Sequence, residues 1–97
     1  MKSGYVYILT NKPNGVLYIG VTDELTKRVE QHRSRAVSGF TKPYNCHRLV
    51  WCQKFDSIHD ARLTERRMKK WNRDWKISRI VEQNPDWRDL FEMGLIP

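Results

Sequence analysis

Cysteine is scarce in this chain, and its scarcity excludes two classes of small protein. The 97 residues include two cysteines, Cys46 and Cys52, which are too few for a disulfide scaffold and form no C-x-x-C pair. Together with His47 they would supply three zinc ligands, but a fourth at suitable spacing is missing. We therefore expect neither a disulfide-stabilised fold nor a zinc site.

Long apolar runs, repeats and low-complexity stretches are absent as well. No apolar run approaches the roughly 20 residues of a membrane span, and no signal peptide opens the chain. A chain of 97 residues is long enough for one modest core. These features predict a single soluble, cytoplasmic domain over residues 1–97, with no membrane partner.

Acidic residues are outnumbered by basic ones, which favours a polyanionic partner. Eighteen Lys and Arg face eleven Asp and Glu, giving a net charge of +7 and a pI near 9.7. Nucleic acid is the leading candidate for such a chain, with DNA first and RNA as an open alternative. The charge alone is also compatible with an ordinary solvated surface.

The hydrophobic pattern predicts three strands, two of them joined by a tight turn. Strands are expected over residues 5–10 and 16–21, with Asn14-Gly15 between them as a hairpin signal, because both residues tolerate a positive backbone φ. A third strand is expected over residues 47–55. Its alternation predicts Leu49, Trp51 and Phe55 on one face and Val50 and Cys52 on the other.

Helical spacing predicts three helices and a short fourth one around these strands. They are expected over residues 25–37, 58–71, 74–83 and 86–93. Ser57 is the expected N-cap of the second helix, and Asn84-Pro85 the break before the last. A loop over residues 38–45 follows the first helix. The order β-β-α-β-α-α predicts a small α+β domain with a three-stranded sheet.

Tyrosines mark both strands of the predicted hairpin. Tyr5-Val6-Tyr7 lies on the first strand and Tyr18-Ile19-Gly20 on the second, so the hairpin holds phenols side by side. Arg28 and His32 follow four residues apart, which places them along one side of the first helix. Phenols beside a cation and an imidazole predict a site for phosphate chemistry.

Two helices carry polar residues in or beside the stripe that should face the sheet. The stripes comprise Leu25, Val29, His32 and Ala36, bordered by Arg28, and Ile58, Ala61, Glu65, Met68 and Asn72. A carboxylate that faces a core, such as Glu65, costs several kcal/mol unless it is paired or binds a metal. A structural salt bridge between Glu65 and Arg28 is one interpretation and a functional site is the other. The neighbouring tyrosine hairpin favours the functional site.

In these motifs the chain resembles the GIY-YIG nuclease superfamily, in particular its small single-domain bacterial members of the UPF0213 type. Val6-Tyr7 matches the end of the first tripeptide, and Tyr18-Ile19-Gly20 matches the second. Residues 25–32 resemble the family's helix that carries an arginine and, four residues later, a histidine or tyrosine. Glu65 resembles the acidic metal ligand on the following helix, and residues 71–76 and 84–87 resemble the tail of the single-domain members.

The resemblance implies an antiparallel sheet flanked by helices and a metal-dependent hydrolysis of DNA phosphodiesters, with one Mg²⁺ or Mn²⁺ ion. Glu65 would ligate the metal. Tyr7 would act as general base, with His32 bonded to its phenol or relaying its proton. Arg28 would hold the scissile phosphate, and Tyr18 would position phosphate or water.

Two positions depart from the pattern of the family. Some relatives carry a lysine directly after the second tripeptide, where this chain has Val21, so a lysine-assisted mechanism is not expected there. Many relatives place an asparagine after the metal-binding glutamate, and Asn72 and Asn84 are the candidates here. We include Asn84 among the catalytic candidates, although it also fits a helix break before Pro85.

A basic segment occupies the second half of the chain. Between Asp60 and Ile80, eight Lys and Arg face three acidic residues, and Trp71 and Trp75 lie among them. The charges favour a DNA-binding surface, whereas the two tryptophans are expected in the core rather than as stacking platforms. The residues predicted to contact nucleic acid are Arg28, Lys42, Arg66, Lys69, Lys70 and Arg73.

These observations predict a metal-dependent DNA endonuclease or nickase that acts in DNA repair or turnover. The alternative is a nucleic-acid-binding module that keeps the nuclease fold without cleaving, while a protein-interaction domain explains the charge less well. The enzyme is favoured because binding alone needs no carboxylate in a basic cleft. The predicted catalytic set is Tyr7, Tyr18, Arg28, His32, Glu65 and Asn84.

Overall fold

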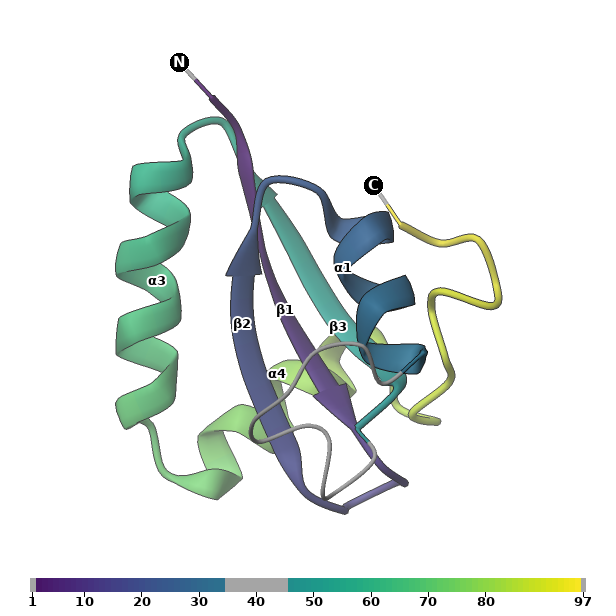
Figure 1. Cartoon of the computed structure of the whole chain (residues 1–97). Coiled ribbons are helices and arrows are strands. Elements are labelled where there is room, and N and C mark those ends of the chain that lie inside the picture. The colour runs from purple at the N-terminus through teal and green to yellow at the C-terminus, as the bar shows by residue number, and fades with distance from the viewer. Residues whose placement is uncertain (1, 35–45, 97) are drawn as a thin grey trace.

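The sheet has three antiparallel strands, as the resemblance implied. A computed structural model describes residues 2–34 and 46–96 (Figure 1). Strands β1 (Gly4–Thr10), β2 (Leu17–Thr22) and β3 (Arg48–Phe55) are ordered β2-β1-β3, so β1 pairs with both neighbours. All five residues from Val6 to Thr10 are fully buried, which makes β1 the centre of the core.

The turn between β1 and β2 depends on Asn14 and Gly15 for different reasons. Asn14 has a φ of 58°, a left-handed conformation that asparagine tolerates better than most residues. Gly15 donates its N–H to the Lys12 carbonyl at 2.9 Å, and a Cβ at Gly15 would overlap the Asn11 side chain. The predicted hairpin is confirmed, but Gly15 supplies space rather than the positive φ expected of it.

Strand β3 contains a bulge that changes which face its side chains occupy. Ile8 of β1 is opposite Trp51, whereas Leu9 is opposite Leu49, so Val50 is the extra residue. One face then carries Leu49 and Cys52, and the other carries Val50, Trp51 and Phe55. The alternation predicted for this strand was wrong, because an extra residue reverses the facing of every side chain beyond it.

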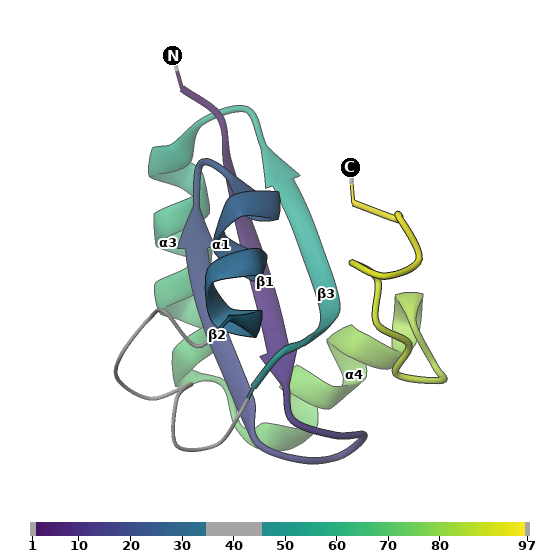
Figure 2. The ribbon, with the colours of Figure 1, turned by 45° about the vertical axis from the view of Figure 1, so that its right-hand side comes forward.

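Helices cover both faces of the sheet (Figure 2). Helix α1 (Leu25–Arg33) packs on the face that carries Tyr7 and Leu49. Helices α3 (Ile58–Lys70) and α4 (Arg73–Gln83) pack on the face that carries Ile8 and Trp51. The helical residues buried against the sheet are Leu25, Val29, His32, Ala61, Met68 and Ile80. This packing confirms the α+β fold and, within the described residues, the stripe predicted for α1. On α3, Ala61 and Met68 are buried and Ile58 and Glu65 half-buried as the predicted stripe requires, but Asn72 is instead the exposed N-cap of α4.

The helix boundaries agree with the sequence at some ends and differ at others. Ser57 caps α3 as predicted, accepting the N–H of His59 at 3.2 Å. Helix α1 ends at Arg33, four residues before the predicted end, and the predicted loop over residues 38–45 lies outside the described residues. No helix within residues 2–34 and 46–96 is both long enough and apolar enough to cross a membrane.

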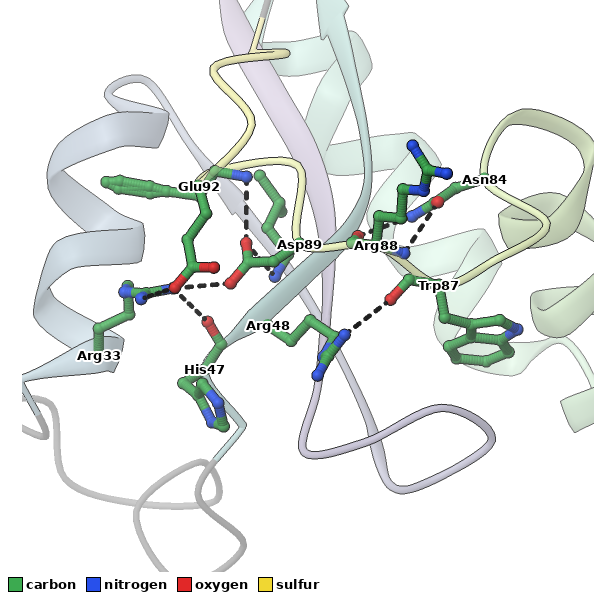
Figure 3. Close-up of polar contacts among 10 residues, drawn as sticks. Arg33, His47, Arg48, Asn84, Trp87, Arg88, Asp89 and Glu92 are labelled. Carbon is green, nitrogen blue, oxygen red and sulfur yellow. Dashed lines mark hydrogen bonds and ion pairs between the residues drawn. The ribbon is translucent and has the colours of Figure 1, made fainter.

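The helix predicted over residues 86–93 is wrong, and the segment instead forms turns against β3 (Figure 3). Trp87 has a φ of 55°, which a helix does not allow. The Asp89 carboxylate accepts the N–H of Leu49 at 3.4 Å, and Leu90 donates its N–H to the Leu49 carbonyl at 2.8 Å. These bonds to β3 replace the helical ladder, because a short polar side chain offers backbone N–H groups an alternative partner.

Candidate active site

Two tyrosines and a histidine meet on the α1 face of the β1–β2 hairpin. Tyr7 lies on β1 opposite Gly20, and Tyr18 lies on β2 opposite Leu9. Ring centroids are 6.3 Å apart for Tyr7 and Tyr18, 6.1 Å for Tyr7 and His32, and 5.2 Å for Tyr18 and His32. The structure therefore brings together three of the residues that the sequence singled out.

Gly20 makes room for the phenol of Tyr7. A Cβ at Gly20 would overlap the Tyr7 hydroxyl, so no larger residue fits opposite this tyrosine without a shift. The Tyr7 hydroxyl consequently lies against β2, which is an edge strand. The glycine that ends the second tripeptide is thus explained by the close approach of a ring rather than by an unusual backbone angle.

The Tyr7 hydroxyl and His32 Nε2 form a buried hydrogen bond of 3.3 Å. Burial lowers the pKa of His32 below its ordinary value of 6.5, and the Arg28 guanidinium lowers it further. The imidazole is therefore neutral at pH 7, and a neutral imidazole has one nitrogen that can accept a proton. In the tautomer protonated at Nδ1, His32 Nε2 accepts the hydrogen bond from the Tyr7 hydroxyl.

The Tyr7 phenol is held in its protonated form. Burial raises the pKa of Tyr7 well above its ordinary value of 10, and the nearby Tyr18 and Glu65 raise it further. The Arg28 guanidinium opposes these effects by its charge and by a hydrogen bond. Tyr7 can therefore take a proton from water at neutral pH only if it gives up its own proton at the same time.

Glu65 lies on α3 with a side chain only 14% exposed. Its carboxylate is 3.0 Å from Lys69 Nζ one helical turn later, so its ion-pair partner is Lys69 rather than the Arg28 that the structural interpretation supposed. Its charge nevertheless contributes to the raised pKa of Tyr7, so Glu65 lies within electrostatic reach of the phenol. Helices α1 and α3 cover opposite faces, yet both contribute a charged residue near the β2 edge.

Arg28 lies half-buried on α1 and lines a hollow of about 160 Å³, whose other walls are Thr22, Asp23, Glu24, Lys27 and Gln31. Its guanidinium acts on both Tyr7 and His32 through charge, so it lies near the shared proton. A partly exposed guanidinium beside that pair can bind a phosphate oxygen with two parallel donors. The phosphate-binding role that the resemblance implies for Arg28 stays a prediction.

A metal ion at this site would depend on Glu65. Within residues 2–34 and 46–96, no three His, Cys, Asp or Glu side chains are grouped to hold a metal. Mg²⁺ commonly uses one or two carboxylates and keeps several waters, so a single nearly buried carboxylate fits its chemistry. The residues present suit a hydrated Mg²⁺ or Mn²⁺ ion, provided that Lys69 moves away from Glu65.

A second hollow on the β2 edge carries two lysines beside Tyr18. Its volume is about 280 Å³, and it is lined by Leu17, Tyr18, Ile19, Lys69 and Lys76. Lys76 of α4 donates to the Lys69 carbonyl at 3.4 Å, which brings the two cations together. Sequence reasoning placed Lys76 in the basic segment but missed its position beside Tyr18, because that depends on the angle between α3 and α4.

The other predicted nucleic-acid contacts fall into three groups. Arg66 and Lys70 are exposed on α3 and free to meet a phosphate backbone. Arg73 instead donates to the carbonyls of Asn14 and Gly15 at 2.7 and 2.6 Å, so it holds the β1–β2 turn. Lys42 lies outside the described residues.

The two asparagines considered for the site have structural partners. The Asn84 amide donates to the carbonyls of Val50 and Arg88 at 3.1 and 2.9 Å, and its oxygen accepts the Arg88 N–H at 3.0 Å (Figure 3). Asn72 caps α4 by accepting the Trp75 N–H at 2.9 Å. Asn84 therefore ties the C-terminal segment to β3, and the structure does not bring it together with the tyrosines.

The fold and the site define a small α+β domain whose hairpin holds two tyrosines against a histidine, between an arginine and a nearly buried glutamate. A family model described as the GIY-YIG catalytic domain matches residues 3–93. Because this match covers nearly the whole chain, the protein belongs to the GIY-YIG family. Membership places it among nucleases, with nucleic acid as the substrate class.

Proteins of similar length match this chain, and one of them has a solved structure with a similar fold. UPF0213 proteins from Pediococcus pentosaceus and Clostridium perfringens are 36% and 33% identical to it, over 75% and 82% of this chain and 76% and 85% of theirs. The solution NMR structure of a UPF0213 protein from Bacillus halodurans matches with a TM-score of 0.57 and 24% identity, covering 97% of this chain and 99% of that one. These relatives support the fold, and their names specify no reaction.

Proposed function

We propose that this protein is a metal-dependent DNA endonuclease or nickase that hydrolyses phosphodiester bonds in DNA repair or turnover. The observation that supports the proposal most directly is the hydrogen bond between Tyr7 and a neutral His32, with Arg28 and Glu65 both near the phenol. A purely structural core has no need for this polar set. Phosphodiester hydrolysis can use each member of the set, as a proton carrier, a phosphate ligand or a metal ligand.

In the proposed reaction, Tyr7 accepts one proton and donates another, so it carries no charge. A water molecule attacks phosphorus and gives a proton to the Tyr7 oxygen, while Tyr7 gives its own proton to His32 Nε2. Tyr7 stays neutral and His32 becomes imidazolium, so no phenolate forms in a place where burial raises the pKa of the phenol. The bond from phosphorus to the leaving oxygen breaks, and that oxygen takes its proton from solvent.

Positive charge near the β2 edge would hold the substrate for this step. Arg28 would bind oxygens of the scissile phosphate, and Lys69 and Lys76 would bind an adjacent phosphate in the hollow beside Tyr18. A divalent ion held by Glu65 would neutralise charge on the reacting phosphate. Binding of that ion would displace Lys69 from its present ion pair with Glu65, and the freed ammonium group could then bind the adjacent phosphate.

The proposal is tested by nicking of supercoiled plasmid with Mg²⁺, with Mn²⁺ and with EDTA, for the wild type and for Glu65→Gln. Asp60→Asn is the matched control, since Asp60 is an exposed carboxylate on the same helix. We expect metal-dependent nicking that Glu65→Gln loses and Asp60→Asn keeps, with DNA binding by Glu65→Gln equal or slightly tighter. Equal nicking by Glu65→Gln would contradict the proposed metal site.

A second candidate is a nucleic-acid-binding module that does not cleave. It is favoured by one observation, the complete burial of Tyr7, because a buried phenol cannot meet water unless neighbouring residues move. The same experiment separates the two candidates. DNA binding without nicking under every metal condition would favour the binding module.

A further inference from the structure

Trp75 is an exposed residue of α4, next in sequence to Lys76 of the hollow that contains Tyr18. Trp71, Trp75, Ser78, Arg79 and Glu82 line an open hollow of about 290 Å³ on α4 and the end of α3, which we call the Trp75 platform. Trp75 is 60% exposed, more than any other large hydrophobic residue that the structure describes. The expectation that both tryptophans are core residues was therefore wrong for Trp75. An exposed indole that lines a hollow together with an arginine offers a flat aromatic surface to a ligand.

Neighbouring residues hold Trp75 in place and leave it largely exposed. Trp71 is half-buried against the core, and the Arg79 guanidinium lies 5.2 Å from the centroid of its ring. Trp75 meets Trp71 edge to face, with centroids 6.4 Å apart and an interplanar angle of 77°. Asn72 fixes the start of α4 by accepting the Trp75 N–H at 2.9 Å. Trp71 and Asn72 thus hold Trp75 in place without covering it.

The polar groups of the platform suit a nucleotide. Arg79 supplies a cation for a phosphate, the Ser78 hydroxyl can donate or accept hydrogen bonds at the edge of a base, and the Glu82 carboxylate can accept them. Lys76, the next residue after Trp75, lines the hollow that contains Tyr18. The two hollows thus lie on neighbouring sides of α4, and a strand bound along Lys69 and Lys76 that crosses this helix would reach Trp75.

We propose that the Trp75 platform stacks an unpaired base of the DNA strand bound at the active site, so the substrate has unpaired nucleotides next to the scissile phosphate. This inference rests on the proposed nuclease function and narrows its substrate class. A base inside a duplex has both faces covered by its neighbours, whereas an unpaired base offers a free face to an indole. A single-stranded or frayed segment is therefore the ligand that fits.

The test is equilibrium binding of a fluorescently labelled single-stranded DNA and of a blunt duplex of the same sequence, with EDTA present to prevent cleavage. The variants are Trp75→Ala, Trp75→Phe, which keeps a ring, and Met93→Ala as a control at another exposed apolar residue. We expect Trp75→Ala to weaken single-strand binding by about 5- to 100-fold and duplex binding much less. Trp75→Phe should recover most of the loss, and Met93→Ala should bind like the wild type.

The proposed stacking role is contradicted if Trp75→Ala binds single-stranded DNA like the wild type, or if it loses affinity for single-stranded and duplex DNA equally. Cleavage of the same labelled single strand and of supercoiled plasmid with Mg²⁺ or Mn²⁺, measured on the same preparations, keeps this failure apart from failure of the nuclease. Cleavage of either DNA by the wild type without any effect of Trp75→Ala on binding would contradict the stacking role and support the enzyme. Loss of single-strand binding in Trp75→Ala, with neither DNA cleaved by the wild type, would support the stacking role and contradict the enzyme.

Discussion

At the scale of residues, the account depends on the proton between Tyr7 and His32. Burial raises the pKa of Tyr7 and lowers the pKa of His32, so both groups are neutral near pH 7. Because the phenol and the imidazole are both uncharged, the pair avoids the high free-energy cost of burying an isolated ion. The pair is therefore stable without substrate, and Tyr7 can still transfer its proton to His32 when a water molecule attacks the phosphate.

The lowered pKa of His32 predicts how stability changes on acidification. Unfolded His32 titrates near its ordinary value of 6.5 and folded His32 below it, so the unfolded state binds more protons between these two values. The stability due to neutral His32 is complete above the unfolded pKa and is lost as the pH falls through the folded pKa. We expect the urea midpoint of the wild type to fall more steeply below pH 6.5 than that of His32→Gln.

His59→Gln is the control for this measurement, because His59 is exposed at the start of α3. Its urea midpoints should follow those of the wild type at every pH. Identical pH dependence of the wild type and His32→Gln would contradict a buried, neutral imidazole at position 32.

At the scale of elements, local signals predicted most of the fold and non-local contacts set the rest. The hairpin, β3 and the helices α3 and α4 follow from periodicity and turn residues within each segment. The bulge at Val50 depends on pairing between β1 and β3, and the turns after Pro85 depend on the bonds of Asp89 and Leu90 to β3. These contacts join residues about 40 positions apart, which periodicity cannot detect.

In the candidate active site too, local motifs predicted some contacts and others depend on how the helices pack. Tyr7, Tyr18 and His32 meet as the motifs predicted, since one hairpin and the next helix carry them. The partner of Arg73 and the exposure of Trp75 depend on how α4 leaves α3, and no pattern in the sequence gives that angle.

The contacts of Arg73 predict that it supports the β1–β2 turn rather than DNA. Its bonds to two turn carbonyls join α4 to the hairpin that carries both tyrosines. We expect Arg73→Met to lower the free energy of unfolding by about 1–2 kcal/mol, as for hydrogen bonds from a charged donor at the surface. Urea denaturation measures this loss, and Lys70→Met, which removes an exposed cation, should change stability by less than about 0.5 kcal/mol.

DNA binding at several salt concentrations gives the opposite ranking of these two variants. Lys70→Met should reduce the slope of log affinity against log salt by about 1, because one phosphate contact is lost. Arg73→Met should leave that slope near the wild-type value. A reduced slope for Arg73→Met with unchanged stability would indicate that Arg73 contacts DNA, as the sequence predicted.

At the scale of the whole molecule, the C-terminal segment joins α1 to β3 (Figure 3). Arg33 at the end of α1 binds Asp89 at 2.7 Å and Glu92 at 2.8 Å, and Arg48 of β3 donates to the Trp87 carbonyl at 3.1 Å. Leu90, the residue after Asp89, packs against the core cluster that contains Tyr7. The segment therefore completes the side of the core on which the candidate active site is built.

The two carboxylates that bind Arg33 are expected to contribute unequally. Asp89 has an 11% exposed side chain and also accepts backbone N–H groups from Leu49 and Phe91, whereas Glu92 is 65% exposed. We expect Asp89→Ala to cost about 1–3 kcal/mol of unfolding free energy, because it leaves buried donors without a partner. Glu92→Ala should cost less than about 1 kcal/mol. Urea denaturation compares them, and equal costs would contradict this role of Asp89.

The central claim is that the Tyr7 hydroxyl takes part in phosphodiester cleavage, and Tyr7→Phe tests it most directly because it keeps the ring and removes one oxygen. The measurement is single-turnover cleavage of bound DNA, with the affinity for that DNA determined separately in EDTA. The account predicts a rate lowered by about 10²- to 10⁴-fold with little change in affinity, as expected for loss of a general base. A variant that cleaves at nearly the wild-type rate would contradict it.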